Sequence, residues 1–393
     1  MTAEIRKQLL QEAETLVVKV GSRVLTDSQK RLDLGRLEQL GAQLCELANR
    51  GKKVVLVSSG AVAAGMGKLN LEQRPADLAV LQAVASVGQA HLIQTYEAVL
   101  ARHNYHAAQV LLTAEDLDDR KRYLNLRNTI VALLGMKVIP VVNENDAVSV
   151  DELLTTFGDN DRLAAMVAGL FKTPALIILS DVDGLFDTSA EVNESGEFPI
   201  LTSIERINDH VLTLASAKSA VSSKSIGSGL GSELGKGGMA SKLRAAQFVT
   251  RSGAPTIIAG GKTPNVLTRL ADGEVLGTLF QPESRGLAPK KRWIGYTAQI
   301  SGRILCDHGA TQALKKTGPS LLAIGVHSIE GSFDKGDIVA ICDYEGNEFA
   351  RGLTNYGSQE LAQIQGLQSN QIQSKLGHCP YEEVIHRDNI AML

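Results

Sequence analysis

Short apolar runs alternate with helically spaced apolar residues from the start of the chain to about residue 280. Continuous apolar runs are typical of parallel strands that are buried on both faces of a sheet. Their alternation with helical segments predicts an α/β fold with a mainly parallel sheet. We expect strands at residues 15–20, 54–57, 137–142, 175–179 and 255–259.

The predicted helices lie between these strands. Leucines repeat at helical spacing from Leu34 to Leu47, and the helix that they form is expected to end near Gly51. Asp159 and Asn160 can cap another helix. Further helical segments are expected around residues 78–102, at 121–135 and after Gly238.

Several of the predicted strands end in glycine, serine, asparagine or aspartate. In open α/β sheets, ligands bind at the carboxyl ends of the strands, where such polar loops gather. We therefore expect a ligand site at that edge of the sheet.

The pattern changes at residues 281–292, where two prolines and three consecutive basic residues predict a linker. Beyond the linker the helical spacing fades and short strands are expected. The sequence thus predicts a large domain at residues 10–280 and a small β-rich domain at residues 293–393. The expected strands of the small domain are residues 321–324, 338–342 and 349–353, with a hairpin turn at 344–347.

Composition and charge exclude several classes of protein. A net charge of −3 creates no field that would recruit nucleic acid or an anionic membrane. No apolar run reaches the roughly 18 residues of a membrane span, and the charged first 14 residues do not resemble a signal peptide. The four cysteines are far apart and the eight histidines show no metal-binding spacing. This usage predicts a cytoplasmic protein without a zinc site or disulfide framework.

The glycine-rich segment at residues 234–243 runs into a predicted amphipathic helix and carries Lys236 and Lys242. Glycine backbone N–H groups and a helix N-terminus together favour an anion, so the segment predicts a polyphosphate site. It is not a P-loop, because Gly235-Lys236 is followed by glycine rather than serine or threonine. The alternative interpretation is a flexible surface linker.

Lys19 lies near the end of a predicted strand that is rich in valine. A lysine is unfavourable in a buried sheet unless its ammonium group meets an anion at the strand end. We therefore predict a lysine that faces phosphate, and the alternative is a side chain that extends into solvent. Ser58 and Ser59 follow the next strand, where they can hold an oxyanion at a helix N-terminus or act only as a helix cap.

Carboxylates and amides are concentrated in two loops, at residues 143–146 and 158–161. Such groups suit the ammonium group of an amino acid, can orient a lysine, and can coordinate Mg²⁺. A solvated acidic surface is the alternative. Ser180 and Asp181 place polar groups at the end of one more predicted strand.

The chain shows neither a nucleophile elbow nor an evident pair of general acid and base. The triplet at residues 386–388 imitates a protein-kinase motif but has no downstream kinase segment, so we assign it no catalytic role. Phosphoryl transfer to a carboxylate would explain the absence of a base. A carboxylate with a pKa of about 4.3 is already ionised at neutral pH, and catalysis then requires positioning and positive charge.

In this order, the segments resemble the amino acid kinase family, and within it the members that phosphorylate glutamate. The resemblance implies a three-layer fold with a mainly parallel central sheet, and it extends from residue 15 to about residue 280. The C-terminal module resembles a PUA domain through residues 331–337 and 351–353. The kinase-like segments are residues 18–22, 58–61, 87–89, 143–146, 158–161, 180–181 and 237–242.

The resemblance implies ATP-dependent phosphorylation of the side-chain carboxylate of L-glutamate, as the first step of proline biosynthesis. At the matching positions, Lys19 and Lys242 would stabilise the phosphoryl group in transfer, and Asp161 would hold both lysines in place. Mg²⁺ would arrive with ATP, and no fixed protein ligand is expected for it.

The same resemblance assigns the binding residues. Ser59, Asp146 and Asn160 would bind glutamate. The ATP site would comprise Lys19, Ser180, Asp181, Lys236, Gly237, Gly238, Met239, Ala240, Ser241 and Lys242.

The resemblance also implies regulation and partners. Proline would inhibit at the glutamate site, the chain would form a homo-oligomer, and the labile acyl phosphate would pass to glutamyl-phosphate reductase.

Two alternative functions stay open. One is another amino acid kinase, of the acetylglutamate or carbamate kinase type.

The other alternative is an RNA-binding protein, because PUA domains often bind RNA. Residues 290–393 contain ten lysines and arginines against eleven aspartates and glutamates. An RNA-binding surface normally has a basic footprint, and this balance speaks against nucleic acid as a partner.

Overall fold

The computed structural model describes residues 2–27, 29, 31–148, 159–192, 198–222, 238–283, 289–378 and 381–393. The chain divides into two compact units, which are described separately. The first contains Met1–Asp116 and Lys121–Gly286, and the second contains Leu117–Arg120 and Leu287–Leu393.

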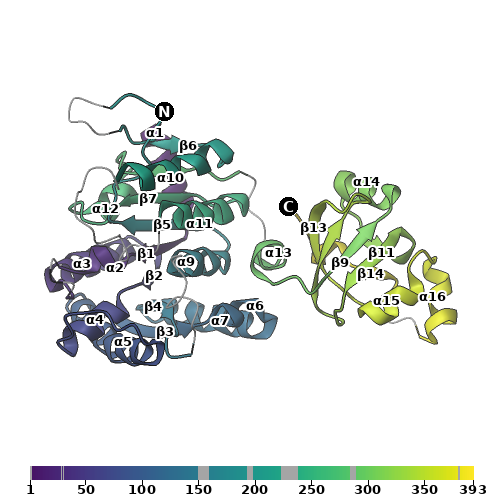
Figure 1. Ribbon diagram of the computed structural model, residues 1–393, viewed down its shortest axis with the longest axis horizontal. Helices are drawn as coiled ribbons and strands as arrows, with labels where there is room; N and C mark the ends of the chain where they lie inside the picture. The colour runs from purple at the N-terminus through teal and green to yellow at the C-terminus, as the bar shows by residue number, and fades with distance from the viewer. Residues whose placement is uncertain are drawn as a thin grey trace. The chain divides into compact units, whose positions relative to one another are not determined.

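The first unit is built on an eight-stranded sheet (Figure 1). Five of its strands are those expected from the apolar runs. The strands are β1 (Thr15–Val20), β2 (Lys53–Ser58), β3 (His106–Leu112), β4 (Val138–Glu144), β5 (Pro174–Ser180), β6 (Ser203–Ile204), β7 (Thr256–Gly260) and β8 (Thr278–Phe280).

The strand order is β3-β4-β2-β1-β5-β7-β8-β6. Only the β7–β8 pair is antiparallel, and all other pairs in this sheet are parallel. The mainly parallel sheet is therefore confirmed. Strand β3 lies at the sheet edge and most of its side chains are partly exposed. It lacks the continuous apolar run of a central strand, and this is why the pattern did not predict it.

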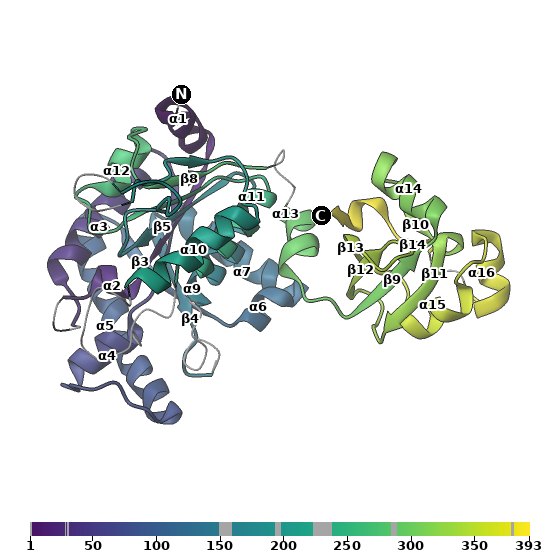
Figure 2. The ribbon, with the colours of Figure 1, turned by 45° about the horizontal axis from the view of Figure 1, so that its top comes forward.

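Helices cover both faces of the sheet, so that the unit has three layers (Figures 1 and 2). Helices α1, α3, α5 and α12 contribute to the core on one face, and α7, α9, α10 and α11 lie on the other. The helices are α1 (Thr2–Glu12), α2 (Ser22–Leu25), α3 (Leu34–Asn49), α4 (Ala61–Lys68), α5 (Leu78–Ala101), α6 (Ala114–Asp118), α7 (Arg120–Gly135), α9 (Asp159–Gly169), α10 (Asp209–Ser222), α11 (Met239–Arg251) and α12 (Val266–Ala271).

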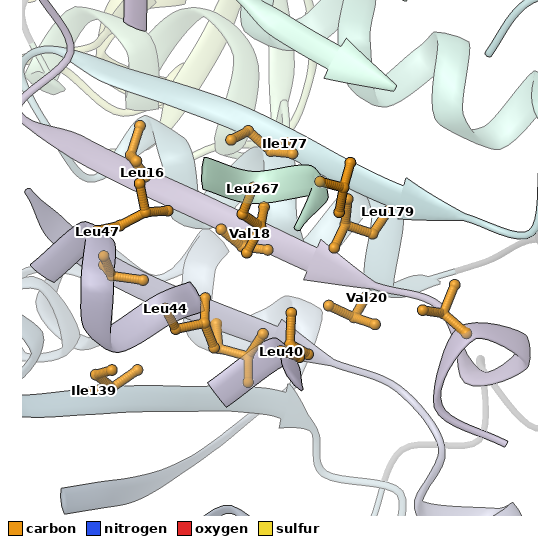
Figure 3. Packing of buried hydrophobic residues seen from close by; sticks show 14 of the residues in the cluster. Leu16, Val18, Val20, Leu40, Leu44, Leu47, Ile139, Ile177, Leu179 and Leu267 are labelled. Carbon is orange, nitrogen blue, oxygen red and sulfur yellow. The ribbon is translucent and has the colours of Figure 1, made fainter. Parts of the chain in front are cut away.

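The main core forms where α3 packs on β1 (Figure 3). Leu16, Val18 and Val20 of β1 meet Leu40 and Leu44 of α3, and all five are almost fully buried. Successive strand residues point to opposite faces. Because Val18 and Val20 face α3, Lys19 between them faces the layer that contains α9.

Helices α4 and α5 approach each other unusually closely. A methyl group on Gly65 would overlap the carbonyl oxygen of Val84, and one on Gly88 would overlap that of Ala61. Only glycine permits this approach at both positions. The contact places the residue after Gly88, Gln89, against the central sheet.

The second unit has a five-stranded sheet in the order β11-β9-β12-β13-β15 and a two-stranded sheet of β10 and β14. It is the predicted β-rich module. Its strands are β9 (Gly302–Cys306), β10 (Leu321–Leu322), β11 (Val326–Gly331), β12 (Ile338–Cys342), β13 (Glu348–Leu353), β14 (Glu383–Ile385) and β15 (Ile390–Met392). Its helices are α13 (Pro289–Arg292), the π-helix η1 (Trp293–Thr297), α14 (His308–Thr317), the 3₁₀ helices η2 (Ala323–Gly325) and η3 (Arg387–Asn389), α15 (Ser358–Ile364) and α16 (Ser369–Leu376).

Three helices of this unit, α14, α15 and α16, were not predicted. The start of α14 has a local signal, because Asp307 accepts a hydrogen bond from the backbone of Ala310 at 2.7 Å. Its end lies at Gly318, whose φ of +61° suits glycine. The strand expected at 321–324 was also too long, since β10 ends at Leu322 and a 3₁₀ turn follows.

The hairpin turn expected at 344–347 is confirmed, since β12 and β13 on either side of it pair antiparallel. Residues 289–292 of the predicted linker form helix α13. In the described part of the chain, no helix combines the length and the apolar character that crossing a membrane requires.

Candidate active site

Lys19, Asp161 and Lys242 form a buried charge cluster at the carboxyl edge of the sheet. Lys19 Nζ lies 2.7 Å from Asp161 Oδ1, and Lys242 Nζ lies 3.3 Å from Asp161 Oδ2. The Asp161 side chain is fully buried and the two lysines are nearly so. Ser241 Oγ also donates to Asp161 Oδ2, at 2.9 Å. One carboxylate thus engages two cations and a hydroxyl.

The fold brings these residues together from three separate elements. Lys19 is the fifth residue of β1 and projects toward α9, whose first turn contains Asp161. Lys242 lies in the first turn of α11, which begins after Gly238. The N-terminal ends of helices carry partial positive charge, so both helix ends reinforce the lysines.

Burial and the neighbouring charges shift the pKa values of Asp161 and Lys242. Burial alone would raise the pKa of Asp161, but Lys19 and Lys242 outweigh burial and hold that pKa below 3.8. Burial lowers the pKa of Lys242 below 10.5, and the charge of Lys19 adds to this effect while Asp161 opposes it. Asp161 is therefore ionised at neutral pH, and the site combines one negative charge with two positive ones.

A second group of side chains lies beside this cluster. Asn160 Nδ2 donates to Ser59 Oγ and to Asn143 Oδ1, both at 3.1 Å. Ser59 follows β2, and Asn143 lies in the last part of β4. Because Asn160 precedes Asp161 in α9, the amide group and the charge cluster belong to one continuous polar site.

The sequence profile described as "Amino acid kinase family" matches residues 14–260. The chain belongs to the amino acid kinase family. This match spans every residue for which we predicted a role in catalysis or binding. A second profile, described as "PUA domain", matches residues 302–376 in the β-rich unit.

Several proteins of one name are similar to this chain over nearly its whole length. "Glutamate 5-kinase" of Rhodopirellula baltica is 47% identical over 99% of this chain and 96% of its own length. The proteins of the same name from Caldanaerobacter subterraneus and Chromohalobacter salexigens are each 44% identical, over 96% and 98% of this chain and 97% and 98% of their own lengths. The predicted resemblance, including the PUA module, is confirmed.

Among solved structures, a UMP kinase from Bacillus anthracis superposes with a TM-score of 0.42 at 14% identity. The superposition covers 69% of this chain and 97% of that one. Likeness at this level does not by itself establish a shared fold.

On the other side of β1, the amino acid kinase unit places Ser180 and Asp181 at the end of β5. Ser180 Oγ donates to Asp181 Oδ1 at 3.1 Å, and Arg23 Nη1 lies 2.8 Å from Asp181 Oδ2. Burial opposes ionisation of Asp181, but the hydrogen bond and charge of Arg23 outweigh it and lower the pKa. Arg23 was not predicted as a site residue, although it lies just beyond the strand that contains Lys19.

The glycine-rich turn of this amino acid kinase is only partly described. Lys236 and Gly237 lie outside the described residues. Gly238 precedes α11 with an extended backbone (φ −64°, ψ 173°) and provides no side-chain cap. Met239 and Ala240 are the first two residues of α11. The backbone at the start of α11 therefore lies in the same helical turn as Lys242.

Asp146 is buried in the turn after β4, with 8% of its surface exposed. Two nearby residues lie in segments that carry the resemblance to the family, but no role was predicted for them. They are Asn143, which bonds Asn160, and Gln89, which bonds Asn143. Sequence signals for both exist, since they lie in segments 143–146 and 87–89, but their contact depends on the fold. In the described parts of the chain, no three metal-ligating side chains gather.

Proposed function

We propose that this chain transfers the γ-phosphoryl group of ATP to the side-chain carboxylate of L-glutamate, the first step of proline biosynthesis. Membership of the amino acid kinase family and the name of its similar relatives support this proposal. The observation in the structure that supports it best is the buried cluster of Lys19, Asp161 and Lys242. It provides two cations where a phosphoryl group would pass.

In the proposed reaction, a carboxylate oxygen of glutamate forms a bond to the γ-phosphorus as the bond from that phosphorus to the ADP oxygen breaks. The carboxylate is already ionised, so no proton is removed. Lys19 and Lys242 would neutralise charge on the phosphoryl oxygens, which is the main requirement of phosphoryl transfer. Asp161 would position the two lysines and limit their mutual repulsion.

Glutamate would bind next to the cluster, at Ser59, Asp146 and Asn160. Carboxylate and amide oxygens accept hydrogen bonds from an ammonium group, and a serine hydroxyl donates to a carboxylate. Ser59 and Asn160 are already in contact at 3.1 Å, and Asn160 adjoins Asp161. This adjacency would bring a bound amino acid to the lysines.

ATP would occupy the region of Ser180, Asp181 and the start of α11, including Lys236 to Lys242. Mg²⁺ would enter with ATP, because it prefers phosphate oxygens and water to all-protein sites. The residues fit this proposal, because both oxygens of Asp161 contact lysines and are therefore not available as fixed ligands of the ion. When bound, the ion would supply additional positive charge at the phosphates.

Regulation and assembly form a further part of the proposal. Proline, as an amino acid with a free carboxylate, would compete at the glutamate site. The chain would form a homo-oligomer and transfer its labile acyl phosphate to glutamyl-phosphate reductase. A cytoplasmic location stays a prediction from the scattered cysteines, of which Cys45, Cys306 and Cys342 are free thiols.

An assay of the full-length chain with ATP, Mg²⁺ and L-glutamate tests the reaction. Hydroxylamine traps an acyl phosphate as a hydroxamate, so we expect hydroxamate and ADP to form together. ADP without hydroxamate would contradict a carboxylate acceptor. Addition of proline in the same assay tests feedback inhibition.

The same assay separates the alternatives within the family. Acetylglutamate kinase activity would require N-acetylglutamate as acceptor, and carbamate kinase activity would require carbamate. We expect free glutamate to be strongly preferred to both. Equal turnover with N-acetylglutamate would contradict the assignment.

A further inference from the structure

A row of hydrogen-bonded side-chain amides leads from the edge of the sheet to the proposed glutamate site. Gln109 of β3, Gln89 of α5, Asn143 of β4 and Asn160 of α9 follow one another, with links of 3.1, 2.9 and 3.1 Å. On the basis of the function proposed above, we propose that Gln89 is a positioning residue for substrate recognition. Through Asn143, it orients the Asn160 amide toward the α-ammonium group of glutamate.

All links of the row run in the same direction. Gln89 Nε2 donates to Gln109 Oε1, and Gln89 Oε1 accepts from Asn143 Nδ2. Asn143 Oδ1 in turn accepts from Asn160 Nδ2. A side-chain amide donates only through nitrogen and accepts only through oxygen. If the amide group of one member rotated by 180°, two nitrogens or two oxygens would therefore face each other.

The direction of the row determines what Asn160 can offer a ligand. Its nitrogen carries two hydrogens, and these are directed to Asn143 Oδ1 and Ser59 Oγ. Asn160 can therefore contact a substrate only as an acceptor, through Oδ1. An ammonium group is a donor without acceptor capacity, so it fits this end of the row.

Ser59 presents the complementary group. Its oxygen accepts from Asn160, so its own hydroxyl hydrogen points elsewhere and can donate to a carboxylate. Asn160 and Ser59 together thus offer one acceptor and one donor side by side. This pair matches the ammonium and carboxylate groups on the α-carbon of an amino acid.

Because these amides are buried, water cannot easily replace a lost hydrogen-bond partner in the row. Asn143 and Asn160 are each 2% exposed and Gln89 is 8% exposed. A buried amide that loses its partner bears the cost of desolvation without a compensating bond, and in a low-dielectric network each bond strengthens the next. Gln109 is exposed, so Gln89 is the outermost buried member of the row.

The backbone holds Gln89 at the required place. Gly88 and Gly65 allow α5 to approach α4 closely, and β3 and β4 pair in register at Gln109 and Val141. The row is thus held in place by the contact between α4 and α5 and by the pairing of β3 with β4. Neither depends on a bound ligand, so the amide row is preformed.

Substitution of Gln89 by methionine tests the proposal in the full-length chain. Methionine keeps the length of the side chain but removes both hydrogen bonds. We expect the KM for glutamate to rise about tenfold, corresponding to the loss of one hydrogen bond to a charged group. The kcat and the KM for ATP should change much less. Gln94→Met, at an exposed position of the same helix, is the matched control.

Gln89→Glu serves as the conservative variant. A carboxylate still accepts from Asn143, and the exposed Gln109 can turn its nitrogen toward it. We expect a glutamate KM near that of the wild type. A rise equal to that in Gln89→Met would contradict the proposal, because the acceptor that orients Asn143 is retained.

Glutarate distinguishes a lost ammonium contact from general damage to the fold. It has both carboxylates of glutamate but no ammonium group. In Gln89→Met, we expect the preference of kcat/KM for glutamate over glutarate to fall about tenfold, since only the ammonium contact is weakened. An unchanged preference would overturn the proposal.

Calorimetric binding of glutamate without ATP separates this inference from the proposed reaction. If the wild type binds glutamate but forms no hydroxamate, the proposed reaction fails, and weaker binding by Gln89→Met still supports the amide row. If wild type and Gln89→Met bind glutamate equally, the amide row fails. A wild type that does not bind glutamate overturns both.

Discussion

At the scale of single residues, the site is organised around Asp161. A buried carboxylate is costly unless it is paired, and a buried lysine is costly for the same reason. Asp161 pairs with Lys19 and Lys242 at once, so each charge offsets the desolvation of the others. The cluster holds a net positive charge in the place where the proposed reaction moves negative charge.

Removal of one lysine of this cluster should affect catalysis. We expect Lys242→Ala to lower kcat by about 100- to 1,000-fold, the usual effect of deleting one group that stabilises transition-state charge. Steady-state kinetics with glutamate and ATP measure it. Lys53→Ala, at the exposed amino end of β2, is the control and should keep near-normal turnover. Near-normal kcat in Lys242→Ala would refute the proposed role.

The effect of Asp161 on stability should depend on pH in a defined way. Asp161→Asn leaves two buried lysines without their counter-ion, so we expect it to lower the free energy of unfolding by about 3 kcal/mol at pH 7. The folded pKa of Asp161 lies below its ordinary 3.8. The stabilisation is thus complete above pH 3.8, and it is lost as the pH falls through the folded pKa.

Urea unfolding followed by circular dichroism measures this difference between wild type and Asp161→Asn. The difference should stay constant from pH 7 to about pH 4.5. A difference that already shrinks at pH 6 would indicate a raised pKa and contradict the expected pairing. Asp272→Asn removes an exposed ion pair with Arg50 and should have little effect.

Residues differ in how far sequence alone reveals their contacts. Lys19 was predictable, because a lysine among buried valines needs a partner. The contact of Gln89 was not, because its partner Asn143 is 54 positions away in the chain. Arg23 was missed for the same reason, since its partner Asp181 follows β5, far away in the chain.

At the scale of elements, glycines decide how closely α4 and α5 approach. We expect Gly65→Ala to lower the free energy of unfolding by about 1–3 kcal/mol, the usual cost of overpacking, because the new methyl group would overlap Val84. Chemical denaturation measures the change. Gly135→Ala, in α7 with open space around it, should be neutral or stabilising. Equal effects of the two substitutions would contradict the packing argument.

The predicted elements were most reliable where the apolar pattern is continuous. Strands β1, β2, β4, β5 and β7 are central and buried, and each was recognised from its apolar run. The edge strand β3 and the short helices of the second unit were not predicted. Many of their side chains are partly exposed, or buried and exposed positions alternate irregularly. The pattern of apolar residues that indicates an element is therefore weaker there.

At the scale of the whole molecule, charge bears on the partner of the PUA-like unit. Residues 290–393 carry a net charge of −1, whereas RNA binding relies on basic residues that displace counterions. We expect the full-length chain to show no tight binding to labelled RNA in fluorescence anisotropy. Tight binding that weakens steeply between about 50 and 200 mM salt would reverse this conclusion.

The sequence by itself determined the class of fold, the position of the five central strands along the chain, and the family. These follow from local patterns, since burial on both faces of a strand leaves a continuous apolar run and polar residues mark the strand ends. Lys19 and the segment at 237–242 could therefore be assigned to one edge of the sheet before any contact was known.

Only the tertiary structure decided which of these polar residues meet. It joined Lys19, Asp161 and Lys242 from one strand and two helices, and it aligned the amide of Gln89 with that of Asn143. Such contacts depend on strand order and on the close approach of α4 and α5. Side-chain hydrogen bonds and ion pairs act over about 3–4 Å, and no spacing along the chain encodes that distance.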